Sequence, residues 1–247
     1  MNYSNSKFAV NIDFYDKSVD DCLTHMVQHA LAGKTTILMT PNIDHLVRMH
    51  QDKHIAKLYS DADMCINDSR IFSIIIKRFF STSLATITGS DVTQAFFEQG
   101  YGNKLNLGIV GCDSKQIKLL CDKYGLAFPA LHVNPSYGFI HKESEVQEIV
   151  SALSSTPLDI IFLAVGSPQQ EILAHRLKGK IAKGSILCVG ASLDYLTGKE
   201  KRAPDIVQAL SLEWLYRFLQ SPIKRFNRYF VSCPKIFRLL RSGRFTS

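Results

Sequence analysis

The sequence has no apolar run long enough to cross a membrane as a helix, which takes roughly 20 consecutive residues. Its most apolar segment, residues 158–165, is short and is followed by a glycine. Residues 1–9 also lack the apolar stretch of a secretory signal. We therefore expect a protein that stays in the cytoplasm.

Paired cysteines and nucleotide-binding glycine motifs are also missing. The six cysteines stand singly, without Cys-x-x-Cys spacing, so we expect reduced thiols that pack as small apolar groups. No Gly-x-Gly-x-x-Gly and no Gly-x-x-x-x-Gly-Lys-Ser/Thr run occurs, so the sequence gives no sign of NAD or ATP binding. We expect no cofactor.

One short acidic motif, Asp61-Ala62-Asp63, resembles the Asp-x-Asp sequence that holds a divalent metal ion in many enzymes. It comes before its predicted strand, whereas ligands of parallel sheets bind beyond the carboxyl ends of the strands. We interpret it as a helix-to-strand turn. The sequence therefore predicts no metal site and no requirement for Mg²⁺ or Mn²⁺.

Short apolar runs alternate with helical patterns along most of the chain. This alternation is typical of βαβ units, which build a largely parallel sheet covered by helices on both faces. We predict an α/β, Rossmann-like fold with a C-terminal basic helical appendage. The expected strands are residues 34–40, 64–66, 105–110, 131–133, 158–165 and 185–189.

Polar residues and glycines follow several of these strands. Because the carboxyl ends of parallel strands share one edge of the sheet, these residues are expected to line a common crevice. The candidate ligand-binding positions are Thr40, Asn42, Asp68, Gly111, residues 167–171 and Asp194.

Asp68 is the candidate catalytic residue among them. A carboxylate at the end of a strand is ionised at neutral pH and can accept a proton from an attacking hydroxyl. The alternative is that Asp68 only caps the helix expected at residues 71–80. The residues alone leave both interpretations open.

Residues 164–171 place a glycine turn after a strand and a proline near the start of the next helix. Free amides at such a helix start suit phosphate or sugar oxygens, and Gln170 adds a side chain that both donates and accepts. A simple strand-to-helix turn explains the same pattern equally well.

The C-terminal residues 214–247 contain eight Lys and Arg residues and no Asp or Glu. Since the whole chain has a formal net charge of only +7, the part before this tail is slightly acidic. The tail also carries eight aromatic residues. A basic, aromatic segment is typical of docking on an anionic membrane surface.

Two alternatives to membrane docking exist for the tail. It can bind nucleic acid, or it can pack on the core or on another subunit. Pro222 and Pro234 divide it into short helices, which favours a docking appendage and argues against one long helix that reads a nucleic-acid groove. We therefore expect no nucleic-acid partner. An apolar patch between core and tail is a candidate contact in a homo-oligomer.

The ordered set of motifs resembles the WecG/TagA/CpsF glycosyltransferases over roughly residues 34 to 230. The motifs are Thr40-Pro41-Asn42 with His45, Ala62-Asp63 through Asp68, Thr88-Gly89-Ser90-Asp91, Gly-Ser-Pro-Gln-Gln-Glu at 166–171, Val189-Gly190-Ala191 with Asp194 and Gly198, Lys201-Arg202-Ala203-Pro204, and Leu212-Glu213-Trp214-Leu215-Tyr216-Arg217.

The resemblance implies an inverting, metal-independent enzyme with a Rossmann-like fold. Its donor would be a UDP-sugar of the N-acetylmannosamine or glucose type. Its acceptor would be a sugar on polyprenyl diphosphate at the inner face of the cytoplasmic membrane, used to build cell-surface polysaccharide. Asp68 matches the family's general base, and Thr40, Asn42 and Gln170 match crevice residues. Arg217, Arg225 and Arg228 match residues that close over the diphosphate.

Two positions depart from the family pattern. The family commonly has Asp-Gly where this chain has Asp68-Ser69, and a basic residue where this chain has Asn227. We divide the chain into a catalytic part, residues 1–203, and a docking appendage, residues 204–247. The alternative function is a non-catalytic module that binds a membrane surface or nucleic acid.

Overall fold

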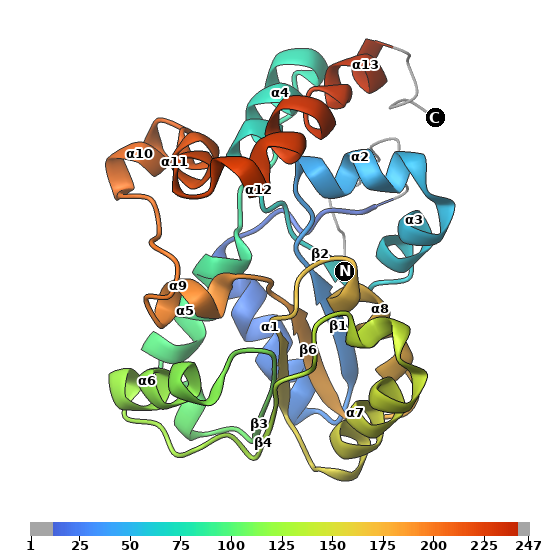
Figure 1. The fold of residues 1–247 in the computed structure, drawn as a ribbon, viewed down its shortest axis with the longest axis vertical. Coiled ribbons are helices and arrows are strands. Elements are labelled where there is room, and N and C mark those ends of the chain that lie inside the picture. Colours follow the sequence, from blue (N-terminus) through green and yellow to red (C-terminus); the bar gives the residue numbers. More distant parts are fainter. Residues whose placement is uncertain (1–11, 242–247) are drawn as a thin grey trace.

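Figure 1 shows the computed structural model of the chain, which describes residues 12–241. Within these residues, six strands form one parallel sheet in the order β2-β1-β6-β5-β3-β4. The strands are β1 (Thr35–Met39), β2 (Met64–Cys65), β3 (Leu107–Val110), β4 (Leu131–Val133), β5 (Ile160–Leu163) and β6 (Gly184–Cys188). The α/β prediction is confirmed, and each expected strand is present with ends that differ by at most two residues.

The strands contribute side chains to two apolar cores, one on each face of the sheet. In β1, Ile37 and Met39 belong to one core and Leu38 belongs to the other. Strand β6 pairs with β1 in register, with Ile186 beside Ile37 and Leu187 beside Leu38. Each core therefore continues from strand to strand. Burial of one such aliphatic side chain stabilises the fold by roughly 2 kcal/mol.

Helices cover both faces of this sheet (Figure 1). Leu38 and Leu187 face α1 (Val19–Leu31), α5 (Gly89–Glu98), α6 (Ser114–Tyr124) and α9 (Ser192–Leu196). The opposite core includes side chains of α2 (Ile43–Gln51), α3 (Lys53–Ser60), α4 (Arg70–Phe80), α7 (Glu143–Ser155) and α8 (Gln169–Leu177). Two short 3₁₀ turns are η1 (Tyr101–Asn103) and η2 (Phe139–His141).

The C-terminal helices lie beyond the carboxyl ends of the strands, near α2 and α4 at the top of Figure 1. They are α10 (Asp205–Ala209), α11 (Glu213–Gln220), α12 (Pro222–Phe226), the π-helical segment η3 (Asn227–Ser232) and α13 (Lys235–Arg241). Helix α13 packs on α2. The predicted domain boundary at residues 203 and 204 falls in the loop before α10, and the division into two domains stays a prediction.

Part of the tail, with Arg244 and Phe245, lies outside the described residues. Among residues 12–241, no helix has both the length and the apolar character needed to span a membrane.

Candidate active site

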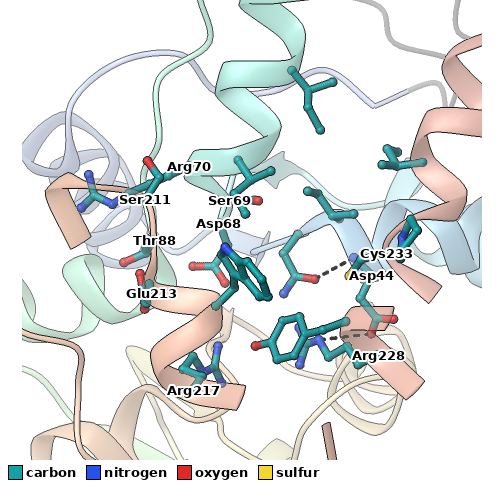
Figure 2. Close-up of a pocket in the computed structure, with 18 of the residues that line it drawn as sticks. Asp44, Asp68, Ser69, Arg70, Thr88, Ser211, Glu213, Arg217, Arg228 and Cys233 are labelled. Carbon is teal, nitrogen blue, oxygen red and sulfur yellow. Dashed lines mark hydrogen bonds and ion pairs between the residues drawn. The ribbon is translucent and has the colours of Figure 1, made fainter. Parts of the chain in front are cut away.

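A cavity of about 290 Å³ lies between the carboxyl edge of β1 and β2 and the C-terminal helices. Figure 2 shows side chains of both parts of the chain pointing into it, including Asp68 and Arg217. The lining residues are Asn42, Ile43, Asp44, Asp68, Ser69, Arg70, Ile71, Ile75, Thr88, Ser90, Tyr195, Ser211, Glu213, Trp214, Arg217, Arg228, Tyr229, Cys233, Pro234, Ile236 and Phe237.

Asp68 is held in this cavity by backbone contacts from two neighbouring loops. Its N–H donates to the carbonyl oxygen of Pro41 at 3.0 Å, and its Oδ1 accepts from the N–H of Gly89 at 3.1 Å. The cap of α4 is Ser69, whose Oγ accepts from the N–H of Phe72 at 3.2 Å. The interpretation of Asp68 as the cap of this helix is therefore wrong, because its neighbour performs that role.

The surroundings of Asp68 keep its proton affinity high. The pKa of its carboxyl group is raised to about 7, chiefly by burial and in smaller part by the negative charge of Glu213. The positive charges of Arg217 and Arg228 and the N–H of Gly89 act in the opposite direction. A carboxyl group with a pKa near neutrality can both accept and release a proton under physiological conditions.

Three helices begin at the wall of the cavity, and a polar side chain caps each one. Asn42 caps α2, where its Oδ1 accepts from the N–H of Asp44 at 3.1 Å. Thr88 caps α5, where its Oγ1 accepts from the N–H of Asp91 at 3.0 Å. Ser69 caps α4. Helix N-termini carry partial positive charge, so their convergence favours an anionic ligand.

Three arginines add full positive charges to the cavity. Arg70 comes from α4, and Arg217 and Arg228 come from the C-terminal helices. Arg217 lies over the ring of Tyr195 at 5.6 Å. In the described part of the chain, the Nε atoms of these three arginines are buried without a hydrogen-bond partner. Buried donors without partners are costly, so oxygen atoms of an anionic ligand would be well placed to accept from them.

Arg228 also contacts a buried carboxylate of the core. Its Nε is 3.7 Å from Oδ2 of Asp44, which forms a closer ion pair with Arg48. Asp44 is only 4% exposed. This contact links the C-terminal helices to α2 beside the cavity (Figure 2).

Arg225, the third arginine expected at the diphosphate, does not line the cavity. Its guanidinium group donates to the carboxylate of Glu200 at 2.7 Å and to the carbonyl oxygen of Arg217. In this arrangement it supports the helix that carries Arg217.

Thr40 and Gln170 follow β1 and β5 on the same edge of the sheet but are not part of the cavity lining. Thr40 donates from Oγ1 to the carbonyl oxygen of Cys188 at 3.0 Å. Gln170 is buried, and its Oε1 accepts from the N–H of Gly190 at 2.9 Å. Both side chains join the end of β6 to its neighbours.

Gly111 and Asp194 lie further along this edge. Gly111 has a φ of 104°, and a Cβ atom there would be 2.6 Å from the carbonyl oxygen of Ala164. Asp194 accepts from Nε2 of Gln116 at 2.7 Å. Helix α9 places Asp194 outside the cavity and its neighbour Tyr195 in the lining. The edge therefore continues from the cavity toward β5 and β3.

The cavity also contains residues for which the sequence predicted no role. The most notable is Glu213, whose charge acts on Asp68 although 145 positions separate the two residues in the sequence. Tyr195 and Trp214 line the same space. The sequence held one indication that Glu213 is special, because it is the last acidic residue before the basic tail.

The Asp-x-Asp motif lies between α3 and β2, as expected of a turn before a strand. Asp63 accepts from the N–H of Ile37 at 2.9 Å and lies 3.7 Å from Lys178. Among residues 12–241, no group of three or more His, Cys, Asp and Glu side chains is arranged to hold a metal ion. Independence from metal ions stays a prediction.

Comparison with known proteins shows the family to which the chain belongs. The chain is 25% identical over 226 residues to the N-acetylglucosaminyldiphosphoundecaprenol N-acetyl-beta-D-mannosaminyltransferase of Bacillus spizizenii. The aligned region covers 91% of this chain and 86% of that protein. It is 24% identical over 228 residues to the protein of the same name from Bacillus subtilis, covering 91% and 87%. The model of the glycosyl transferase WecG/TagA/CpsF family matches residues 8–247. The predicted resemblance is confirmed, and the chain is a glycosyltransferase that belongs to the WecG/TagA/CpsF family.

Proposed function

We propose that this enzyme transfers a sugar from a UDP-sugar to a sugar carried on polyprenyl diphosphate, with inversion at the anomeric carbon and without a metal ion. The names of the two Bacillus relatives support an N-acetylmannosamine-type donor and an N-acetylglucosamine-bearing diphosphate acceptor. The observation that carries the proposal is the meeting of Asp68 with Arg217 and Arg228 in one cavity. Together they provide a proton acceptor beside groups that neutralise phosphate.

In the proposed reaction, the carboxylate of Asp68 accepts the proton of the attacking hydroxyl of the acceptor sugar. The oxygen of this hydroxyl forms a bond to the anomeric carbon of the donor, and the bond from that carbon to the diphosphate oxygen breaks. UDP leaves with the electron pair. A single displacement from the face opposite the leaving group inverts the configuration.

The leaving diphosphate carries the negative charge that develops during the reaction. The starts of α2, α4 and α5 and Arg217 are positioned to stabilise it. Arg217 suits this role because its buried Nε has no partner in residues 12–241. With these groups in place, the reaction needs no divalent cation for charge neutralisation.

The C-terminal helices support a location at the inner surface of the cytoplasmic membrane. Ile223 is 94% exposed and Phe226 is 53% exposed, and basic residues surround both in the sequence. Exposed apolar side chains can enter the membrane interface while Arg and Lys contact anionic headgroups. The docked enzyme would then meet its lipid-linked acceptor at the cavity.

The test is product analysis with Asp68→Asn and a panel of UDP-sugars. Wild-type protein, purified without divalent metal, should form a disaccharide on a synthetic lipid diphosphate acceptor, detected by mass spectrometry. Asp68→Asn should lower turnover by about 100-fold or more, because one general base contributes about 10²–10⁴-fold. Asp61→Asn, at a carboxylate outside the cavity, should retain activity and is the matched control.

Full turnover of Asp68→Asn would contradict the proposed mechanism. Absence of transfer by the wild type with every donor and acceptor would favour the alternative, a binding module on a Rossmann-like core.

A further inference from the structure

The cavity has two chemically different ends. Thr88 and Glu213 lie at the polar end with Arg217, and Figure 2 shows them on the opposite side from Cys233. The other end is apolar and is formed by side chains of α2, α4, the end of η3 and α13. The apolar lining residues are Ile43, Ile71, Ile75, Cys233, Pro234, Ile236 and Phe237.

This apolar end reaches the surface of the protein. Ile236 is 1% exposed and Ile75 is 5% exposed, so both belong to the interior of the fold. Phe237, the next residue on α13, is 50% exposed and also lines the cavity. An apolar group bound between α4 and α13 can therefore continue outward past Phe237.

A ligand that fills both ends must join an anionic group to an apolar one. A UDP-sugar is polar along its whole length, and a sugar hydroxyl beside Ile71 and Ile75 would lose its hydrogen bonds to water. A prenyl diphosphate has the required order, with charged oxygens for Arg228, while Arg217 serves the departing UDP, and a branched hydrocarbon chain that follows directly.

We infer that the apolar end, between α4 and α13, binds the first isoprene units of the polyprenyl diphosphate acceptor. The inference rests on the proposed function and assigns one part of the acceptor to one part of the cavity. A membrane phospholipid shares the combination of phosphate and hydrocarbon, so the experiment includes a straight-chain phosphate as a separate ligand.

Trp214 makes direct measurement of binding practical, because it is the only tryptophan of the chain and it lines the cavity. Its fluorescence is titrated with farnesyl diphosphate, inorganic diphosphate and dodecyl phosphate, below micellar concentrations and without vesicles. Farnesyl diphosphate should bind at least tenfold more tightly than either other ligand, since each buried methylene group adds about fourfold in affinity.

Two variants remove apolar surface from the cavity, and each has a control on a neighbouring segment. Ile71→Ser on α4 is compared with Ile74→Ser, because Ile74 is 54% exposed and lies outside the lining. Phe237→Ser is compared with Val231→Ser, since Val231 is 48% exposed and also outside the lining. The two cavity variants should bind farnesyl diphosphate at least fivefold more weakly than the wild type and should bind inorganic diphosphate with unchanged affinity. The two control variants should bind both ligands as the wild type does.

Equal affinities of the wild type for farnesyl diphosphate and inorganic diphosphate would overturn the inference. The inference would also be overturned if the wild type bound dodecyl phosphate as tightly as farnesyl diphosphate. The same holds if the cavity variants lost equal affinity for farnesyl diphosphate and inorganic diphosphate. These results are independent of transfer. Binding of farnesyl diphosphate without any sugar transfer would defeat the proposed function alone, whereas sugar transfer without prenyl preference would defeat this inference alone.

Discussion

Arg225 and Glu200 form an ion pair at 2.7 Å, and neither residue lines the cavity. The same arginine donates to the backbone carbonyl of Arg217, so one side chain ties α12 to α11 and to the loop after α9. The arginines of the basic tail therefore divide into two kinds. Arg217 and Arg228 line the cavity, and Arg225 fixes the backbone from which Arg217 extends.

This division predicts that Arg225 acts through position and not through contact with substrate. Arg225→Ala should lower kcat/KM by roughly tenfold, the equivalent of a lost charged hydrogen bond. Glu200→Gln should produce a smaller loss in the same direction, because the bond from Arg225 to the Arg217 carbonyl remains. Steady-state kinetics with a lipid-linked acceptor measure both variants. An effect of Glu200→Gln as large as that of Arg217→Ala would contradict the division.

The pH dependence of the reaction should reflect the raised pKa of Asp68. The proposed base works only when ionised, so kcat/KM should rise with pH and level off above an apparent pKa of about 7. Glu213→Gln removes a negative charge that raises this pKa, and the rising limb should move to lower pH. Rate profiles between pH 5 and 9 test the shift. An unchanged profile in Glu213→Gln would show that the two carboxylates do not interact.

Asp68 should also affect stability, with a defined sign. Its pKa is about 7 in the folded protein, compared with 3.8 for an aspartate exposed to water, as in the unfolded chain. The folded protein therefore binds this proton more tightly than the unfolded chain does. Stability from this group is therefore present at acidic pH and is lost as the pH rises toward 7. Asp68→Asn should raise Tm at pH 8 relative to wild type and have less effect at pH 5. Thermal unfolding monitored by circular dichroism gives both values.

Much of the sheet was predictable because its strands are continuous apolar runs that end at polar residues or glycine. Asp68 was placed correctly at the carboxyl edge for the same reason, since the end of β2 fixes its position. The proximity of Glu213 to Asp68 was not predictable from the sequence, because it depends on how the C-terminal helices pack against the core. Tertiary contacts such as that of Arg228 with Asp44 set this arrangement.

The separate roles of Arg217 and Arg225 were likewise hidden from the sequence. A regular helix would place both by its period of 3.6 residues, but α11 ends at Gln220 and a new helix, α12, begins at Pro222. The direction of each side chain therefore depends on backbone breaks that periodicity does not encode.

The ion pair of the buried Asp44 with the partly exposed Arg48 should matter far more for stability than a pair in which both side chains are exposed. Asp44→Asn leaves arginine charges without their buried partner and should destabilise the fold by about 3 kcal/mol. Asp61 forms the same i, i+4 pair with Lys57, but the side chains are 41% and 73% exposed. Asp61→Asn should change stability by less than about 1 kcal/mol. Urea unfolding of the two variants measures the difference, and equal effects would refute it.

Substitution of Gly111 should destabilise the fold for two reasons. Its φ is positive, and a side chain at this position would have no space. Gly33 also has a positive φ, of 72°, but a Cβ atom there would meet nothing within 4 Å. Gly33→Ala should therefore cost about 1 kcal/mol, from backbone strain alone. Gly111→Ala should cost clearly more, because the added atom would meet the Ala164 carbonyl at 2.6 Å. Chemical denaturation of both variants separates strain from crowding.

The cavity is assembled from positions that lie far apart in the sequence, from Asn42 to Phe237. Of the elements that line the cavity, the ribosome adds α13 last, so a growing chain holds Asp68 long before it holds the wall opposite. Under the proposed mechanism, catalytic competence therefore arises only once α13 has been made. Prematurely terminated products that lack α13 would be inert, and the cell would not spend activated sugar on them.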